Sequence, residues 1–335
     1  MIENNILPNS ASALAVTIVC GGAGFIGTTL IQRLLQEGRQ VIVIDDLSRG
    51  REAHILRLKH NGCLVFKQAD LADRLQCEFA FEFAKTFGQV TEVWHLAANS
   101  DIPAGVADSD VDLKDTFLTT VEILRCMKIH KIGTIFFASS SAVYGDLGDQ
   151  PLHEDIGPLL PISNYGAMKL ASEALISAAA ESHLEHACLF RFPNVVGVPA
   201  THGVILDFVR KLKVTANVLE VLGNGTQRKA YLHVSDLVDA MCFVRSKIKK
   251  YKLLPINIGP VDDGVYVSWI AEQVVARFAP DARIDFGAGD RGWVGDVPQF
   301  HYLTKRIQDM GWKPCLGSEA AVMRAIEEIA GQEGL

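Results

Sequence analysis

The chain has 335 residues, of which 49% are hydrophobic and 21% are charged, and its formal net charge is −7. The apolar fraction is too high for an intrinsically disordered protein, and the acidic balance argues against a nucleic-acid partner. No apolar run approaches the ~20 residues of a membrane span, and the seven cysteines contain no CxxC pair, so we expect a cytoplasmic globular protein without metal sites or disulfides.

In chain order, the first half of the sequence alternates short apolar runs with longer segments of helical periodicity. The apolar runs lack the alternation of half-exposed strands, which is typical of parallel strands buried on both faces. This repetition predicts right-handed βαβ units and an α/β fold with a doubly wound Rossmann sheet. The predicted strands are Val16–Cys20, Val41–Asp45, Leu64–Lys67, Val93–Ala97, Ile135–Ser139 and Ala187–Phe192, and the predicted helices are Phe25–Glu37, Leu71–Phe87, Leu113–Lys128 and Tyr165–Ser182.

A glycine-rich segment follows the first predicted strand and opens the first predicted helix. Gly21 permits a tight turn, Gly24 lets the backbone approach a pyrophosphate, and Gly27 lets the helix pack closely on the strand. Asp45 ends the next strand, where a carboxylate accepts hydrogen bonds from an adenosine ribose and repels a 2′-phosphate. The combination predicts NAD as the cofactor. The alternative is a structural glycine turn followed by a capping aspartate.

After about Pro193 the elements become shorter and the loops become richer in glycine and proline. This change predicts a boundary between two domains. We expect an NAD-binding Rossmann domain over residues 13–195, which also receives part of 230–260. A smaller mixed α/β domain over residues 196–335 is then expected to bind the substrate.

A tyrosine and a lysine lie four residues apart at the start of a predicted helix, at Tyr165 and Lys169. This spacing places both side chains on one face. A tyrosine with a pKa near ~10 is a poor base, but a nearby ammonium favours the phenolate. Tyr165 is therefore predicted to take a proton from a sugar hydroxyl as hydride leaves the same carbon. The alternative is that both residues are ordinary helix side chains without a catalytic role, because this pair also arises by chance.

Three consecutive serines, Ser139–Ser141, end the fifth predicted strand. The carboxyl ends of parallel strands are where open α/β sheets bind their ligands. A serine hydroxyl at this edge can hydrogen-bond the reacting oxygen. The alternative is a polar strand end that satisfies its own backbone.

Together these motifs resemble the extended branch of the short-chain dehydrogenase/reductases and, within it, the nucleotide-sugar epimerases. The order and spacing match over nearly the whole chain. The further landmarks are Asp45-Asp-Leu-Ser48, Asp70-Leu71, His95-Leu-Ala-Ala98, Val143-Tyr-Gly145, Arg191-Phe-Pro-Asn194, Gly223–Val234 and Arg291–Pro298.

The resemblance implies roles for individual residues of this chain. It implies a catalytic set of Tyr165, Lys169 and Ser140, the last counted three residues back from Val143. It implies that NAD is bound by Gly21, Gly24, Phe25, Ile26, Gly27, Asp45, Asp46, Ser48, Asp70, Leu71, Leu96, Ala97, Ala98, Ser139, Tyr165, Lys169 and Pro193. It implies that the substrate is bound by Ser100, Ser140, Asn194, His202, Gly203, Val204, Arg228, Lys229, Arg291 and Asp296.

The sequence departs from the family pattern at positions that bear on the reaction. Sugar dehydratases carry an Asp-Glu pair after the catalytic hydroxyl, because elimination needs a further acid and base. Ser141 and Ala142 stand there in this chain, which favours oxidation followed by re-reduction. Lys229 occupies the usual place of a phosphate-binding arginine, with Arg228 beside it. Trp293 replaces a second arginine, whose nearest substitute is Arg291.

The resemblance therefore implies an isomerase: an NAD-dependent nucleotide-sugar epimerase of the UDP-glucose/UDP-galactose 4-epimerase type. It also implies a homodimer that forms through a four-helix bundle. Three alternatives stay open: a nucleotide-sugar oxidoreductase, an epimerase for another donor (uronic acid, N-acetylated sugar or heptose) or another carbon, and a cofactor-binding regulator without turnover.

Overall fold

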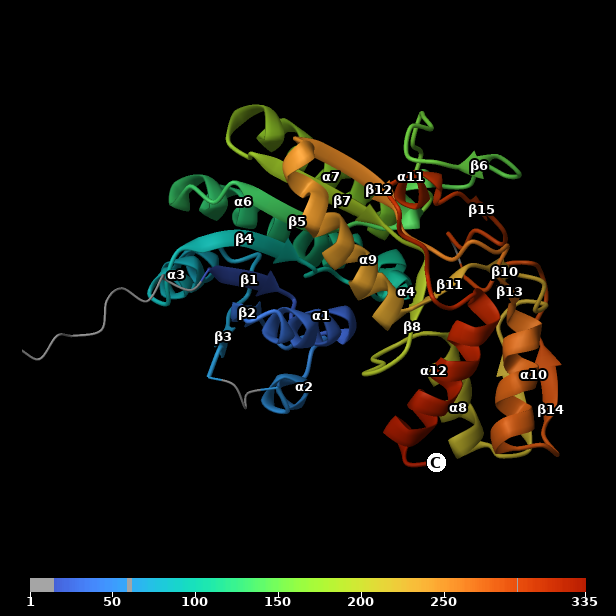
Figure 1. Cartoon of the computed structure of the whole chain (residues 1–335). Helices are drawn as coiled ribbons and strands as arrows, with labels where there is room; N and C mark the ends of the chain where they lie inside the picture. Colours follow the sequence, from blue (N-terminus) through green and yellow to red (C-terminus); the bar gives the residue numbers. More distant parts are fainter. Residues whose placement is uncertain (1–14, 59–61, 294) are drawn as a thin grey trace, which may run out of the picture.

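An open sheet of seven parallel strands forms the larger part of the chain in the computed structural model, which describes residues 15–58, 62–293 and 295–335 (Figure 1). The strand order is β12-β7-β5-β4-β1-β2-β3, so the chain starts in the middle, winds to one edge and then to the other. The predicted doubly wound α/β class is confirmed. The strands are β1 (Val16–Cys20), β2 (Gln40–Asp45), β3 (Leu64–Gln68), β4 (Val90–His95), β5 (Thr134–Ala138), β7 (His186–Arg191) and β12 (Leu253–Asn257).

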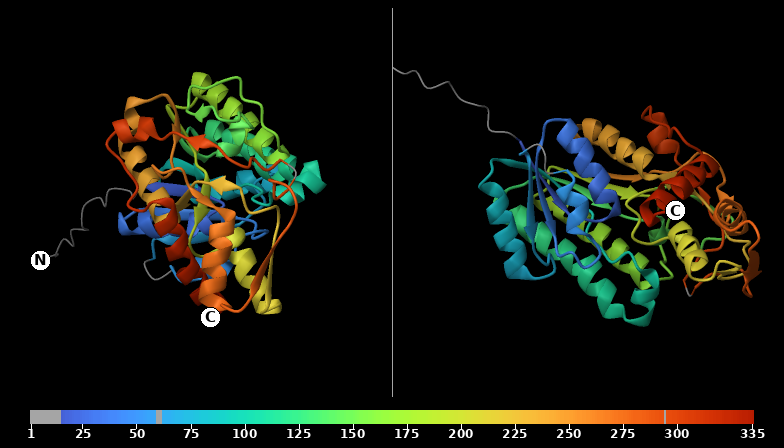
Figure 2. Two further views of the ribbon diagram at one scale, coloured as in Figure 1. Left: turned by 90° about the vertical axis from the view of Figure 1, so that its right-hand side faces the viewer. Right: turned by 90° about the horizontal axis from the view of Figure 1, so that it is seen from below.

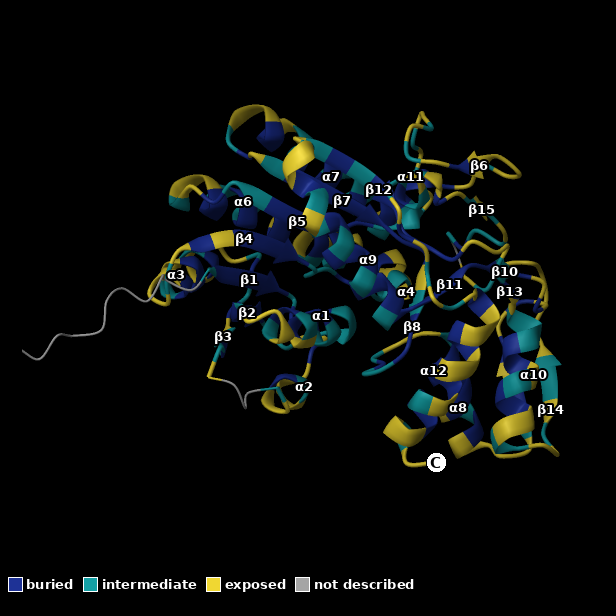
Figure 3. Cartoon of the chain, viewed as in Figure 1, coloured by how far each residue is buried: buried dark blue, intermediate teal, exposed yellow. Residues whose placement is uncertain are grey.

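Helices cover both faces of the sheet, which explains why its strands are apolar on both sides. Val19 and Val43 pack into a core shared with helices α1 and α9, whereas Ile18 and Ile42 pack into a core shared with α3, α6 and α7. Strands β1 and β2 are accordingly buried at every residue (Figure 3). Within the described residues, no helix is both long and apolar enough to cross a membrane. The helices of this part are α1 (Phe25–Gln36), α2 (Glu52–Leu56), α3 (Arg74–Lys85), α4 (Ile102–Ala107), α5 (Ser109–Asp112), α6 (Thr119–His130), α7 (Asn164–Ser182), α9 (Val234–Lys247) and the short η3 (Ser141–Tyr144) and η4 (Ile248–Lys250).

Two predicted helices differ from the structure at their starts. Helix α3 begins at Arg74 because the Asp73 side chain accepts a hydrogen bond from the backbone N–H of Gln76, at 2.9 Å. The helix predicted from Leu113 begins with a π-helical turn, η2 (Leu113–Leu118), before α6 continues it. Such turns carry no distinct periodicity in the sequence and often mark functional sites.

The smaller part has its own apolar core and stands at one end of the sheet (Figure 2). Helices α8, α10 and α12 pack around this core, which also includes Leu219 and Val221 of β9. Strand β12 pairs in the large sheet, and helix α9 packs against it. Residues 13 and 14 of the predicted boundary lie outside the described residues. The elements are β6 (Pro151–Leu152), β8 (Asn194–Val196), α8 (Val204–Val214), β9 (Val218–Val221), β10 (Arg228–Lys229), β11 (Tyr231–His233), β13 (Val265–Tyr266), α10 (Val267–Phe278), β14 (Arg283–Phe286), β15 (His301–Tyr302), α11 (Lys305–Asp309) and α12 (Ser318–Glu333).

Candidate active site

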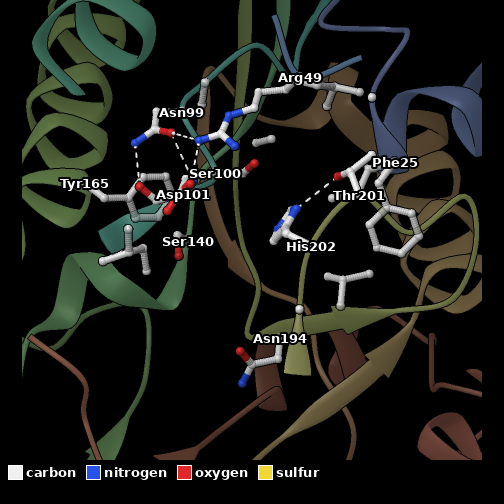
Figure 4. Close-up of a pocket in the computed structure, with 18 of the residues that line it drawn as sticks. Phe25, Arg49, Asn99, Ser100, Asp101, Ser140, Tyr165, Asn194, Thr201 and His202 are labelled. Carbon is white, nitrogen blue, oxygen red and sulfur yellow. Dashed lines mark hydrogen bonds and ion pairs between the residues drawn. The ribbon is translucent and has the colours of Figure 1, made fainter. Parts of the chain in front are cut away.

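A cavity of about 660 Å³ lies along the carboxyl ends of β1, β2, β4 and β5 and continues to α8 (Figure 4). Its volume falls in the range of ~300–1,000 Å³ that ligand sites occupy. We call its lining residues between 21 and 193 the cofactor half and those between 194 and 296 the substrate half. All the residues predicted to bind NAD or to act in catalysis line the cavity.

The glycine loop after β1 can be built only from glycine at two of its positions. Gly21 has a φ of +77°, and an added Cβ would lie 2.5 Å from the backbone nitrogen of Ala97. A Cβ on Gly27 would lie 2.6 Å from the carbonyl oxygen of Gly21. Helix α1 begins at Phe25 within this segment, and Gly24 at its N-cap position has no side chain to occupy the first N–H groups. These groups are therefore available to a pyrophosphate.

Asp45 is held in place at the end of β2 by the loop beside it. One carboxylate oxygen accepts a hydrogen bond from the backbone N–H of Ala23 at 2.9 Å, and the other accepts one from Leu47 at 2.8 Å. Burial raises the pKa of the Asp45 carboxyl, and the two backbone hydrogen bonds act in the opposite direction. Each oxygen keeps a lone pair for a ribose hydroxyl.

The glycine loop and this oriented carboxylate together fit NAD. The loop offers backbone N–H groups for the pyrophosphate, and Asp45 offers acceptors for the adenosine ribose. Arg49, the nearest candidate for holding a 2′-phosphate, instead contacts Asp101 and Asn99. The arrangement therefore favours NAD over NADP.

The three serines after β5 take different roles. The Ser139 hydroxyl donates a hydrogen bond to the buried carboxylate of Glu173, which is itself paired with Arg191 at 2.6 Å. Ser140 accepts a hydrogen bond from the backbone N–H of Ala142 at 3.1 Å, and its hydroxyl lowers the pKa of Tyr165 against the larger effect of burial. Of the three serines, Ser139 and Ser140 line the cavity.

Tyr165 and Lys169 lie on one face of α7, where Lys169 is buried and Tyr165 is partly exposed. The Lys169 ammonium lies 5.8 Å from the centre of the Tyr165 ring and donates a hydrogen bond to the carbonyl of Ala138 at 2.6 Å. Burial raises the pKa of Tyr165 to about 12, against the hydrogen bond from Ser140. Burial also lowers the pKa of Lys169 to about 7, against the negative charges of nearby carboxylates. These pKa values belong to the protein without a bound cofactor.

The substrate half contains part of the predicted substrate set. The residues that line the cavity, in either half, are Ser100, Ser140, Asn194, His202, Gly203, Val204, Lys229 and Asp296. Lys229 is paired with Asp296 at 2.6 Å and also donates to the carbonyl of Val297. Burial lowers the pKa of Lys229, and the Asp296 carboxylate opposes this shift.

The two arginines predicted beside the substrate lie elsewhere among the described residues. Arg228 pairs with Asp263 at 3.6 Å and stacks on Tyr266, outside the cavity. Arg291 pairs with Asp146 at 2.9 Å, also outside it. Trp293 lines the cavity and is 41% exposed.

The prediction missed several residues that line the cofactor half. Arg49 follows β2, whereas Asn99 and Asp101 follow β4. Their side chains gather beside Tyr165 and Ser100 (Figure 4). The signal that identified Asp45, a polar residue at the carboxyl end of a parallel strand, applies to these residues too.

Comparison with known proteins shows a match to the NAD dependent epimerase/dehydratase family over residues 17–259. The chain belongs to this family. A UDP-glucose 4-epimerase of Mycolicibacterium smegmatis is 30% identical over 93% of this chain and 97% of its own length. A UDP-galactose 4-epimerase crystal structure is 32% identical, covers 95% of this chain and 99% of its own, and has a TM-score of 0.81.

Family members share the same fold at lower identity. The UDP-glucose 4-epimerase of Thermus thermophilus, solved in complex with NAD, is 24% identical over 94% of this chain and 99% of its own, with a TM-score of 0.81. The predictions of an NAD-dependent epimerase and of an isomerase are thereby confirmed at the level of the family. The roles of the individual site residues stay predictions.

Proposed function

We propose that this protein is a UDP-sugar 4-epimerase that interconverts UDP-glucose and UDP-galactose. The observation that carries the proposal is the cluster of Ser140, Tyr165 and Lys169 in one cavity with a dinucleotide site. The named relatives support this donor and this carbon. Ser141 and Ala142, which follow Ser140, offer no additional acid or base for an elimination.

The proposed reaction begins with proton transfer from the C4 hydroxyl of the sugar to the phenolate oxygen of Tyr165. Ser140, which lines the same cavity as Tyr165, orients the reacting oxygen. Bound NAD supplies the hydride acceptor for the oxidation and the hydride donor for the reduction. The C4 carbon loses hydride as its oxygen loses the proton, which leaves a 4-keto sugar.

The second half of the reaction reverses these transfers on the other face of the sugar. The nucleotide stays anchored in the substrate half while the flat keto sugar turns over. Hydride returns to C4, and Tyr165 returns its proton to the oxygen, so that no net oxidation takes place. The Lys169 ammonium, when protonated, stabilises the Tyr165 phenolate that exists before the first proton transfer and again after the second.

A homodimer is part of the proposal. Helix α7 packs beside α6, and the surface of η2 and α6 exposes Leu113, Leu118 and Ile129 to fractions of 42%, 37% and 51%. A second copy that packs on these helices would bury those side chains. Light scattering on the purified protein should give twice the mass of the chain.

We also propose a cytoplasmic location, which the seven free cysteines support.

The test of the function is an NMR assay of the purified protein with UDP-glucose or UDP-galactose and no added cofactor. Conversion of either sugar to the same equilibrium mixture is expected. No turnover in a preparation that contains bound NAD would contradict the proposed donor. The uronic-acid, N-acetylated and heptose donors would then be tested in the same assay. Stoichiometric consumption of added NAD would indicate an oxidoreductase.

A further inference from the structure

An ion pair joins two loops at the cofactor half of the cavity. Arg49 Nη2 lies 2.9 Å from Asp101 Oδ2, and it donates a hydrogen bond to Asn99 Oδ1 at 3.2 Å (Figure 4). Arg49 belongs to the loop after β2, whereas Asn99 and Asp101 belong to the loop after β4. All three residues line the cavity.

The order of the strands shows what this ion pair spans. Strand β1 lies between β4 and β2 in the sheet, and the glycine loop follows β1. A contact between the loops after β2 and β4 therefore bridges the glycine loop from one side to the other. A pyrophosphate on the N–H groups of that loop would lie at this bridge.

Both ends of the bridge are fixed by the surrounding chain. The second oxygen of Asp101 accepts a hydrogen bond from the backbone N–H of Ala104 at 3.1 Å and caps α4. Asn99 is 2% exposed, and its amide donates to Asp101 O and to the buried Asp112 carboxylate, both at 2.9 Å.

The Arg49 end is fixed by the backbone of its own loop. The backbone N–H of Arg51 donates to the carbonyl of Ala23 in the glycine loop at 3.2 Å. Gly50 lies so close to Ala23 that a Cβ there would meet the Ala23 Cβ at 2.6 Å. The loop therefore cannot move away easily. The Arg49 side chain is therefore the part of this bridge that can move when a ligand passes.

We propose that Arg49 and Asp101 form a clasp that retains NAD by slowing both its binding and its release. A ligand crosses the same contact on entry and on exit, so the clasp acts on the rates in both directions and leaves the dissociation constant nearly unchanged. A transient-oxidation epimerase needs such retention, because an enzyme that lost the reduced cofactor midway could not reduce the keto sugar. The need for retention rests on the proposed function. The test of the clasp does not, because it measures only NADH binding and release and requires no sugar.

The expected effect is modest, because both side chains are partly exposed: 44% for Arg49 and 39% for Asp101. Water and salt screen an ion pair of this kind, which limits the change in the release rate to about two- to fivefold. The same reasoning predicts that added salt speeds release from the wild-type protein more than from a variant without the pair.

The experiment loads the protein with NADH and follows the loss of its fluorescence when excess NAD displaces it. The variants are Arg49→Gln, Asp101→Asn and the double variant. Asparagine keeps an oxygen for the α4 cap, so Asp101→Asn removes only the charge. Each single variant should release and bind NADH about two- to fivefold faster, with a nearly unchanged dissociation constant. The double variant should be no faster than either single variant.

Two outcomes would overturn the clasp. If Asp101→Asn binds NADH more tightly and Arg49→Gln binds it more weakly, Arg49 is a phosphate ligand that Asp101 restrains. If neither rate changes, the pair has no part in retention. Arg277→Gln is the matched control, because it breaks the exposed pair with Glu327 far from the cavity and should leave both rates unchanged. Thermal unfolding of each variant checks that the fold is intact.

Discussion

In the cofactor half of the cavity, several predicted side chains stand at the ends of parallel strands, whereas in the substrate half they come from loops, short strands and the start of α8. Asp45 directly ends β2, and Ser139 and Ser140 directly follow β5. Lys229, in contrast, lies in the two-residue strand β10, and Asp296 lies in a loop. The cofactor half contains all the residues predicted for NAD. The substrate half does not contain Arg228 and Arg291, which were predicted there but lie outside the cavity.

Each half of the cavity also contains a buried lysine, and the two lysines differ in their hydrogen-bond partners. Lys169 donates to the neutral carbonyl of Ala138, whereas Lys229 lies against the carboxylate of Asp296. Burial lowers the pKa of both lysines. Lys169 can therefore exchange its proton near neutral pH, which suits a catalytic residue, and Lys229 has a partner that holds its charge.

The largest effect is expected from Tyr165→Phe, which removes the proposed base but keeps the ring. The rate of epimerisation should fall by about 10²–10⁴-fold, as for the loss of general acid–base catalysis. Bound NAD, measured by absorbance after denaturation, should stay at the wild-type level. Tyr266→Phe, outside the cavity, is the control. Activity at the wild-type level in Tyr165→Phe would refute the proposed mechanism.

Asp45→Asn tests the cofactor half without touching catalysis. Loss of the charged acceptors should weaken NAD binding by about tenfold to a hundredfold, because hydrogen bonds to a charged group contribute about 1.5–3 kcal/mol. Calorimetric titration of the cofactor-free protein with NAD and NADP measures both affinities. Asp73→Asn keeps a good helix cap outside the cavity and should change neither. An unchanged NAD affinity in Asp45→Asn would show that this carboxylate does not bind the ribose.

Lys229→Met tests whether the substrate half uses its buried lysine as the phosphate anchor. The KM for the nucleotide sugar should rise by about tenfold, the loss of one hydrogen bond to a charged group. Stability should also fall by about 3 kcal/mol, because Asp296 would remain buried without its partner. Lys229→Arg separates these effects, since it keeps the charge. A normal KM in a folded Lys229→Met protein would exclude Lys229 as the anchor.

The pKa of Lys169 predicts how the stability of the cofactor-free protein depends on pH. Its pKa is about 7 in the folded state and 10.5 as a model value, so the unfolded chain binds more protons between these two pH values. Stability contributed by this group should therefore rise with pH from about 7 to 10, by up to about 1.4 kcal/mol per pH unit. Urea unfolding at pH 7, 8 and 9 measures the slope. Lys169→Met should flatten it, and parallel slopes for the two proteins would contradict the prediction.

The fold and the cofactor half could be predicted because buried parallel strands leave a strong apolar pattern and place the next polar residue at the ligand edge. The choice between Arg228 and Lys229 could not be made in this way. Consecutive residues of a strand point to opposite faces, so only one of the two can face the cavity. The pairing of β10 with β13 fixes which one, and two residues leave no alternation to recognise. The contact of Arg49 with Asp101 joins two separate loops, which no local pattern records.

The smallest effects are expected from Arg228→Ala and Arg291→Ala. Both arginines make ion pairs outside the cavity, with Asp263 and Asp146, and partly exposed pairs of this kind contribute about 0–1 kcal/mol. The KM for the nucleotide sugar should therefore change less than about twofold, and steady-state kinetics beside Lys229→Met gives the comparison. A tenfold rise for Arg291→Ala would show that its loop brings the arginine into the cavity when substrate binds. The substrate half would then be completed by its ligand, whereas the cofactor half is formed in advance.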